Sequence, residues 1–424
     1  MTDVIVVGAG PAGAAAALMA ARDGLDVVLL ERGPYPGSKN AYGGVVYGRV
    51  LDDVLPGWYD EVPVQRWITR RSTMVLTETR ALTVDFRSDD WGSAPYNGCT
   101  TFRGDFDSWL AGKAVEAGAQ LVTSTVATGL IREGDRVVGV TTDRPDGDLR
   151  APLVIAADGV NSFLAKEAGL LPRTQAKHLT LGVKEVLSLP REVINERFGV
   201  RGDHGVDVEV LGCTRGIPGG GFVYTNADSL SVGVVVSLEH LAAAKVRPED
   251  LIADLKAHPG IAPWVEGAEL KEYTAHLIPE GGYDHLPELA IPGMLVTGDA
   301  AGLCLAAGIW LEGVNFAIGS GLAAGRQARA VLDGDLKAYR KDLESGFVLQ
   351  DHKRLRGAPD LVLSSRVQQQ YPGLLADLVQ GLFTVTNPDA KPGALRLLRG
   401  AAKKNGVKLR HLVSDGLKGG RVFR

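Results

Sequence analysis

The sequence predicts an α/β protein with a Rossmann-like nucleotide-binding domain, an antiparallel β-sheet substrate domain and a helical C-terminal region. Residues 3–32 have the pattern of a strand, a glycine-rich turn, a helix and a second strand. Between about 71 and 288, several stretches alternate apolar and polar residues with a period of two, which indicates antiparallel strands. At 424 residues and 45% hydrophobic, the chain is long enough for more than one domain.

The N-terminal segment DVIVVGAGPAGAAAA carries the glycine spacing that holds a dinucleotide. Residues 3–7 are expected to form a buried parallel strand. Gly8 then makes a tight turn, Gly10 lets the backbone approach a pyrophosphate, and Gly13 allows close contact between helix and strand.

The helix after this turn is expected to begin near Pro11 and Ala12, with its free N–H groups aimed at the phosphates. Glu31, followed by Arg32, stands at the end of the second strand, where an acid accepts hydrogen bonds from the adenosine ribose. Glu31 also argues against a cofactor whose ribose carries a 2′-phosphate, because the two negative charges would repel each other. NAD and FAD proteins share this unit, so it leaves the choice between them open.

Two later strands also end in an acid. Residues 153–157 run into Asp158-Gly159, and a strand after residue 289 runs into Gly298-Asp299. An acid at the carboxyl end of a parallel strand is well placed to form hydrogen bonds with a ribityl chain. For Asp158 the alternative is a helix cap.

Together with Arg103 in FRGDFDSWL, these segments resemble the flavoprotein family that includes aromatic hydroxylases, geranylgeranyl reductases and electron-transfer-flavoprotein dehydrogenases. In that family the dinucleotide is FAD, and its domain is of the glutathione-reductase type. The resemblance implies that Asp299 binds the ribitol, that Arg103 lies near the flavin or its pyrophosphate, and that Val126 lies beside the adenine.

Within this family the chain resembles the FixC branch, the bacterial relatives of electron-transfer-flavoprotein:quinone oxidoreductase. The resemblance rests on residues 37–51, 219–236, 277–287, 345–355 and 370–385. It implies that FAD takes electrons from a reduced electron-transfer flavoprotein and passes them to a quinone, with a ferredoxin-like subunit as a further partner.

The chain has three cysteines, Cys99, Cys213 and Cys304, which are far apart in the sequence. Four thiolates are needed for an iron–sulfur cluster, so we expect no metal site in this chain and place the cluster in the ferredoxin-like partner. Sparse, unpaired cysteines also fit a reducing cytoplasm.

The loop of residues 37–51 is the part that the resemblance places near the flavin ring. Lys39, Asn40 and Tyr42 are candidate contacts there. Gly43 and Gly44 would allow the loop to approach the ring closely.

A second ring-side element is the helix expected to start at Glu312-Gly313-Val314-Asn315. Its N–H groups would stabilise negative charge on flavin N1 and O2. Because the flavin carries out the redox chemistry, we nominate no catalytic acid or base.

These assignments predict a discontinuous organisation of the chain. The FAD-binding domain is expected at 1–70, 100–169 and 289–333, the antiparallel-sheet substrate domain at 71–99 and 170–288, and a helical, basic region at 334–424. Residues 123–142 are expected to form a hairpin that turns near Gly134-Asp135.

The net charge of −4 gives no reason to expect a nucleic-acid partner. From residue 388 onward, however, ten Lys or Arg stand against two Asp, which suits anionic lipid headgroups, an acidic partner protein or simply a solvated helical face. Residues 371–385 are the best candidate for a lipid-facing or partner-facing surface, with a core helix as the alternative. Residues 300–311 are too few to span a bilayer and suit a buried element. We expect a cytoplasmic protein, with any membrane contact peripheral and at the inner face of the cell membrane.

Other functions remain open at this stage. An aromatic monooxygenase would be expected to have His and Pro after GDAA, where this chain has GDAAGLCLAAGIW. A geranylgeranyl-type isoprenoid reductase shares GDAAG but has an aromatic-and-Pro strand motif in place of GGGFVYTN. Direct oxidation of a small metabolite in a biosynthetic pathway is a third alternative, and a redox-inactive FAD-binding assembly subunit is a fourth.

Overall fold

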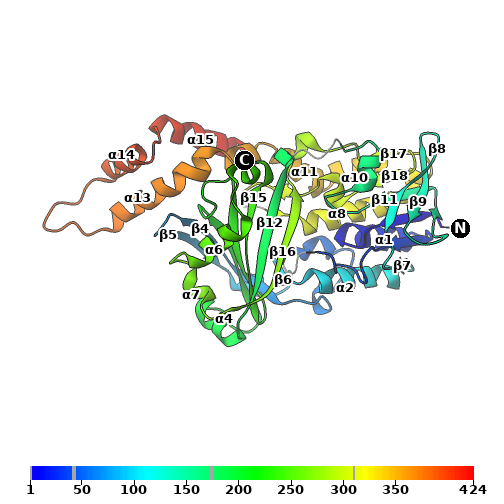
Figure 1. The fold of residues 1–424 in the computed structure, drawn as a ribbon, viewed down its shortest axis with the longest axis horizontal. Coiled ribbons are helices and arrows are strands. Elements are labelled where there is room, and N and C mark those ends of the chain that lie inside the picture. Colours follow the sequence, from blue (N-terminus) through cyan, green and yellow to red (C-terminus); the bar gives the residue numbers. More distant parts are fainter. Residues whose placement is uncertain (1, 41–43, 172–175, 309–310) are drawn as a thin grey trace.

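The computed structural model describes residues 2–40, 44–171, 176–308 and 311–424. Figure 1 shows a nucleotide-binding part at one end, a large twisted sheet in the middle, and C-terminal helices that project from the opposite end. The mixed α/β architecture agrees with the predicted fold class.

The nucleotide-binding part is built on a six-stranded sheet in the order β17-β18-β11-β1-β2-β7. Its strands are β1 (Val4–Val7), β2 (Val27–Leu30), β7 (Gln120–Val122), β11 (Leu153–Ala156), β17 (Ala290–Ile291) and β18 (Met294–Val296). All pairs are parallel except β17 with β18. The strands β1, β2 and β11 are buried throughout, as expected of a parallel sheet covered on both faces.

A three-stranded antiparallel sheet, β8 (Ala127–Glu133), β9 (Arg136–Thr142) and β10 (Leu149–Arg150), lies beside β11. The pairing of β8 with β9 confirms the predicted hairpin and its turn. Helices α1 (Pro11–Arg22), α2 (Arg103–Glu116) and α8 (Val314–Arg326) pack together, with α1 in contact with both of the others. The short helix α3 (Phe163–Glu167) follows β11.

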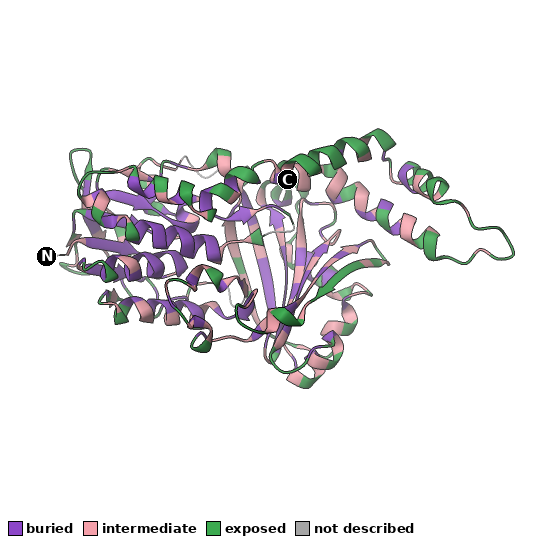
Figure 2. Ribbon diagram, turned by 180° about the vertical axis from the view of Figure 1, so that it is seen from behind, coloured by how far each residue is buried: buried purple, intermediate pink, exposed green. Residues whose placement is uncertain are grey.

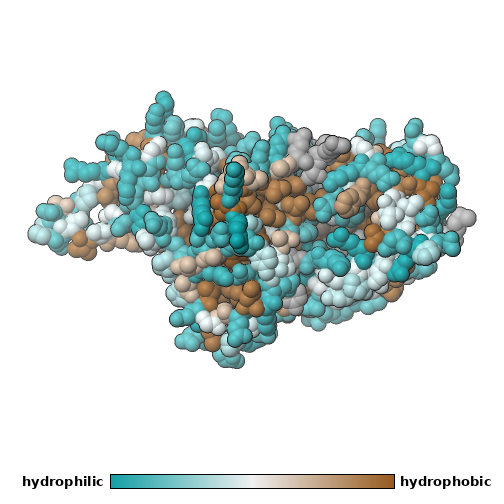
Figure 3. All heavy atoms as spheres, in the orientation of Figure 1, coloured by the Kyte–Doolittle hydropathy of each residue, from teal (hydrophilic) through white to brown (hydrophobic). Residues whose placement is uncertain are grey.

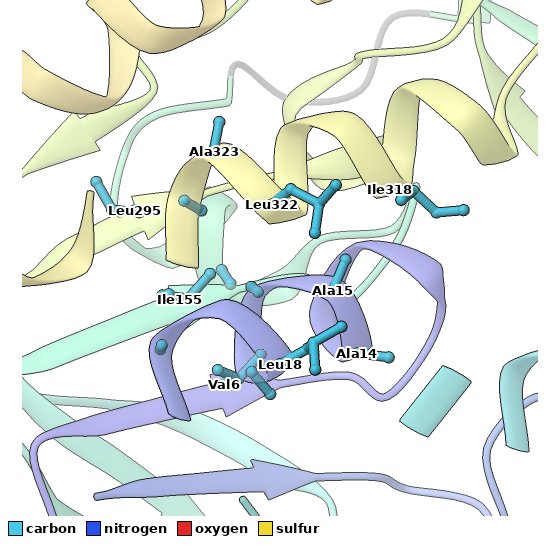
Figure 4. Close-up of a cluster of buried hydrophobic side chains, with 14 of the residues drawn as sticks. Val6, Ala14, Ala15, Leu18, Ile155, Leu295, Ile318, Leu322 and Ala323 are labelled. Atoms are coloured by element: carbon cyan, nitrogen blue, oxygen red, sulfur yellow. The ribbon is translucent and has the colours of Figure 1, made fainter. Parts of the chain in front are cut away.

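Helices α1 and α8 approach each other very closely because both present small residues. A Cβ on Gly321 would lie 2.8 Å from the carbonyl carbon of Ala12, and a Cβ on Gly325 would lie 2.7 Å from the Cβ of Met19. Figure 4 shows Ala15 of α1 on the side that faces Ile318 and Leu322 of α8. Ala14 and Leu18 lie on the other side of α1 and belong to the same buried cluster. This packing fixes the relative position of the two helix N-termini.

The large sheet has nine strands. They are β3 (Gly44–Val46), β4 (Arg66–Leu76), β5 (Ala81–Arg87), β6 (Cys99–Thr101), β12 (Leu179–Ser188), β13 (His204–Leu211), β14 (Gly219–Thr225), β15 (Ser229–Ser237) and β16 (Glu269–Pro279). The pairing is antiparallel, as predicted, except that β13 runs parallel to β4. A long stretch of chain separates these two strands, so no hairpin forces them to run in opposite directions.

One face of the large sheet is apolar and the other carries polar side chains; burial alternates along β14, whereas most residues of β13 and β15 are buried on both faces (Figure 2). The apolar face buries Val183, Val208, Val223, Val232 and Val234 in a core. Helices α4 (Arg191–Phe198), α5 (Leu238–Ala244), α6 (Pro248–Ala257) and α7 (Ala262–Val265) contribute to this core. The opposite face is therefore left for polar side chains.

Strands β3 and β6 and the first part of β4 lie within ranges that we assigned to the FAD-binding domain, yet they pair in the large sheet. The assigned boundaries remain predictions. The two-stranded pair β19 (Leu305–Ala306) and β20 (Leu311–Glu312) lies just before α8.

The C-terminal region is helical. Its helices are α9 (Ala328–Leu332), α10 (Ala338–Ser345), α11 (Phe347–Arg354), α12 (Ala358–Val362), α13 (Tyr371–Phe383), α14 (Ala394–Lys404) and α15 (Leu409–Val422). Helices α13 and α14 bury a small core of their own, which includes Leu374, Ala401 and Ala402. Over the described residues, no helix combines the length and the apolar composition needed to cross a bilayer.

Candidate functional site

The glycines of the N-terminal turn form a cradle in which side chains have no room. A Cβ on Gly8, whose φ is +102°, would lie 2.9 Å from the carbonyl carbon of Ala157. A Cβ on Gly13 would lie 3.0 Å from the carbonyl carbon of Gly8. The helix α1 begins at Pro11, as predicted, with Gly10 as its N-cap, so its free N–H groups open onto this turn.

Arg103 lies next to this turn. The Cβ position at Gly10 is 3.8 Å from Nη2 of Arg103 and 3.9 Å from Oδ2 of Asp107. Arg103 donates two hydrogen bonds to the Asp107 carboxylate, at 2.8 and 2.9 Å, and Asn40 donates to the same carboxylate at 3.3 Å. A fixed guanidinium beside a helix N-terminus suits a diphosphate, because both contribute positive charge.

Asp107 was not among the residues chosen from the sequence. Its side chain is fully buried, and it orients Arg103 by a bidentate ion pair. The four-residue spacing within FRGDFDSWL puts both side chains on one helix face, and that spacing was the available signal.

Glu31 is buried at the end of β2, and both of its carboxylate oxygens accept backbone hydrogen bonds. Oε2 accepts from Ala9 N at 3.2 Å and Oε1 from Gly33 N at 2.6 Å. The backbone of Thr125 also bonds to Glu31, which brings the exposed Val126 to the same edge as this acid. The neighbouring Arg32 is exposed.

The two acids at strand ends differ in their surroundings. Asp158 accepts hydrogen bonds from Ser162 Oγ at 2.9 Å and from Leu164 N at 3.3 Å, so it acts as the cap of α3 that we had weighed as the alternative. Burial raises the pKa of Asp299, and the charge of Arg103 opposes this shift. Asp299 therefore lies near enough to Arg103 for their charges to interact.

The glycines next to these acids adopt backbone conformations that favour glycine. The φ angles of Gly159 and Gly298 are +77° and +63°. The amide of Gly298 donates to Ser320 Oγ of α8 at 3.1 Å, which ties the GD turn to that helix.

On the ring side, α8 starts at Val314 with Gly313 as its N-cap, as predicted. Asn315 donates through Nδ2 to Glu312, while its Oδ1 is buried and has no hydrogen-bond partner among the residues that the structure describes. A buried acceptor without a partner, such as this oxygen at the start of a helix, suits a ligand that donates a hydrogen bond.

The ring-side loop is described only in part. Gly44 begins β3 with open space around its Cβ position, and Lys39 is exposed. The candidates Tyr42 and Gly43 lie outside the described residues.

Comparison with known proteins identifies the family of this chain. Residues 3–174 match the family model described as FAD dependent oxidoreductase. An Escherichia coli protein named probable electron transfer flavoprotein-quinone oxidoreductase YdiS is 39% identical, over 98% of each chain. Protein FixC of Bradyrhizobium diazoefficiens is 37% identical, over 100% of this chain and 99% of the relative. The chain belongs to the FixC family of FAD-dependent oxidoreductases. Its cofactor is FAD, as predicted.

Solved structures support the fold of this FixC-family chain. A geranylgeranyl bacteriochlorophyll reductase-like protein from Thermoplasma acidophilum has a TM-score of 0.71 and is 21% identical, over 95% of this chain and 98% of that protein. A flavin-dependent brominase has a TM-score of 0.63 and is 18% identical, over 100% and 94%. At these identities the likeness extends to the fold alone.

The polar face of the large sheet adds residues that the sequence analysis did not select. Arg71 of β4, Asp207 and Glu209 of β13, and Tyr224 of β14 share this face, opposite the valine core. The segment VDVEVL could have revealed the two acids, because they alternate with buried valines and so lie on the opposite face of the strand.

Proposed function

We propose that this FixC-family protein accepts electrons from a reduced electron-transfer flavoprotein onto FAD and passes them to a quinone. The observation that carries the proposal is the similarity, over 98% of both chains, to the Escherichia coli protein named as such an oxidoreductase. The cofactor supplies the chemistry, since a flavin takes and gives electrons singly or in pairs. The chain then has to bind the cofactor, exclude water and shape access for donor and acceptor.

We assign the cofactor contacts along the cradle from adenosine to ring. The adenosine is expected at Glu31, Arg32 and Val126, and the diphosphate at the N-terminus of α1 with Arg103. The full set of proposed contacts is Gly8, Gly10, Pro11, Ala12, Gly13, Glu31, Arg32, Gly43, Gly44, Arg103, Val126, Asp158, Gly159, Gly298, Asp299, Gly313, Val314 and Asn315. Since the carboxylate of Asp158 caps α3, we expect this residue to contribute through its backbone.

We further propose that a ferredoxin-like subunit is part of the same electron route. The three cysteines of this chain lie far apart in sequence, in β6, after β13 and before β19, and each carries a free thiol. A four-thiolate cluster therefore needs a second chain.

The C-terminal helices supply a surface for peripheral membrane contact. Phe383, Val385 and Leu395 are 82%, 71% and 70% exposed, at the tip of the projecting pair α13 and α14 (Figure 1). The exposed Arg396 and Arg399 stand beside them. Apolar side chains flanked by cations suit an anionic lipid surface. Most of the face seen in Figure 3 is hydrophilic, with hydrophobic atoms gathered in the middle of the molecule and in smaller groups on the sheet and the C-terminal part.

Vesicle flotation tests this surface. The wild-type protein is expected to float with phosphatidylglycerol vesicles and not with phosphatidylcholine vesicles, and the double variant Phe383→Asp, Val385→Asp is expected to stay at the bottom. The control is Phe163→Asp, which changes a ring on α3 that is 67% exposed. Equal flotation of both variants would contradict the assignment.

The electron route is tested anaerobically with the FAD-loaded protein. Reduced electron-transfer flavoprotein is expected to bleach the flavin spectrum, and a short-chain quinone is then expected to restore it. If the quinone does not reoxidise the flavin while a small metabolite is turned over, the metabolite oxidoreductase alternative replaces this proposal. Saturation of an isoprenoid double bond by the reduced protein would favour the geranylgeranyl-type reductase instead.

A further inference from the structure

A cluster of ionisable side chains lies on the polar face of the large sheet, outside the cofactor cradle. Arg71 on β4 contacts two carboxylates of β13, Asp207 at 3.1 Å and Glu209 at 2.8 Å. Tyr47, which follows β3, lies under the Arg71 guanidinium, 5.6 Å from ring centroid to Cζ. Tyr224 of β14 completes the cluster and stacks on Phe222 at 4.6 Å.

The cluster is placed at the ring end of the cofactor site. Tyr47 follows the loop that the FixC resemblance puts near the flavin, and Glu312 immediately precedes α8. The charge of Glu312 acts on Tyr47 and on Glu209, so Glu312 lies near the cluster. Asp207 is 2% exposed, and its carboxylate is hydrogen-bonded by Arg71 and Tyr47.

The charges in this cluster do not balance. Two carboxylates share one guanidinium, and Glu312 adds a third acid nearby, so one carboxyl is expected to keep its proton near neutral pH. Burial and then the charge of Asp207 raise the pKa of Glu209 to about 7, with Glu312 adding to the rise and Arg71 opposing it. The Glu209 side chain is 25% exposed, which leaves it open to a bound molecule.

We propose that Glu209 donates a proton to one oxygen of a bound quinone and that Arg71 positions that oxygen. The inference rests on the proposed function, because it assigns the acceptor site of the same electron route. Quinone reduction takes up two electrons and two protons. Electrons that arrive from a partner protein carry no protons, so both protons enter from solvent through groups of this chain.

The transfer through Glu209 delivers one of the two protons. The O–H bond of the Glu209 carboxyl breaks, an O–H bond forms on the nearer oxygen of the reduced quinone, and solvent reprotonates the carboxylate; the other quinone oxygen takes its proton from solvent by a separate route. Arg71 stabilises the carboxylate until it is reprotonated, since it already pairs with both acids. A carboxyl with a pKa near the working pH suits this exchange because it gives and regains a proton with equal ease.

The test compares wild type with Glu209→Gln and with the control Glu133→Gln, an exposed acid in the β8–β9 hairpin. The measured quantity is the rate at which a short-chain quinone reoxidises the reduced flavin, from pH 5.5 to 9. The wild-type and control rates are expected to fall about tenfold per pH unit above pH 7. Glu209→Gln is expected to be slower by about 100-fold at pH 6 and flat across the range. An unchanged rate and pH profile in Glu209→Gln would overturn the assignment.

A second readout needs neither donor nor quinone. The infrared band of a protonated carboxyl is expected to titrate near pH 7 in the oxidised, FAD-loaded protein, to vanish in Glu209→Gln and to persist in Glu133→Gln. Absence of this band in wild type refutes the proton role even if quinone reduction occurs. Failure of the quinone to reoxidise wild type refutes the proposed function instead, so the two failures are distinguishable.

Discussion

The contact between α1 and α8 makes a sharp prediction, because it sets the distance between the two helix N-termini assigned to the cofactor. In Gly321→Ala the new Cβ would lie 2.8 Å from the carbonyl carbon of Ala12, and ordinary contact begins at 3.4 Å. The carbonyl oxygen of Ala12 lies closer still, so the helices must separate by more than 0.6 Å. Alanine gains about 1 kcal/mol in helix propensity, but overpacking of this kind typically costs about 1–3 kcal/mol. We expect a net loss of stability and a cradle displaced by a large fraction of an ångström.

The matched control is Gly400→Ala in α14, where a Cβ meets nothing within 4 Å. This change is expected to stabilise the protein by about 1 kcal/mol. The assays are thermal unfolding and FAD affinity by fluorescence titration. Gly321→Ala is expected to lower the melting temperature and to weaken FAD binding at least tenfold, whereas Gly400→Ala raises or preserves both. Tight FAD binding and full stability in Gly321→Ala would refute the argument that this contact positions the site.

Three further changes test other parts of the chain. Asp299→Ala is expected to weaken FAD binding by about 10- to 100-fold, which corresponds to the loss of one or two hydrogen bonds to a charged group. The control Asp135→Ala, in an exposed turn, is expected to leave FAD affinity unchanged. Equal affinities of the two variants would remove Asp299 from the site. Glu31→Ala leaves the amides of Ala9 and Gly33 without their acceptor, so we expect about 1–3 kcal/mol lower stability and weaker FAD binding, measured by denaturant titration with and without FAD. Asp415 accepts hydrogen bonds from Arg366 at 2.6 and 2.7 Å, and these bonds, together with one from Tyr371, lower the pKa of Asp415 to about 2. The pair therefore stabilises the folded state fully above the ordinary carboxyl pKa, and this contribution is lost as the pH falls through about 2. Asp415→Asn is expected to loosen α15 at pH 7 and to speed tryptic cleavage after Lys418, and an unchanged cleavage rate would contradict the role of this pair.

Local sequence was sufficient for the cofactor end of the protein. The strand, the turn at Gly8 to Gly13 and the helix at Pro11 are consecutive, and each is determined by residues a few positions apart, so pattern and conformation coincide. The same holds for the β8–β9 hairpin and for the start of α8 at Val314. Arg103 was selected by resemblance, and its place beside Gly10 depends on packing between α1 and α2.

The role of Asp158 shows the limit of this reasoning. A sequence in which an acid follows a buried strand suits a ribityl contact and a helix cap equally well. Only the positions of Ser162 and Leu164 decided for the cap. Asp107 was missed for a related reason, since an acid within a helix gains its role only when the partner beside it is known to face the cradle.

By itself the sequence determined the FAD cradle, the alternation of the large sheet and the helical C-terminus, because these depend on periodicity and on contacts between near neighbours. The tertiary structure decided the parallel pairing of β13 with β4 and, through it, the meeting of Arg71 with Asp207 and Glu209. Those residues are more than a hundred positions apart in the chain. Their ion pairs depend on which strands become neighbours in the sheet, and no local pattern encodes that choice.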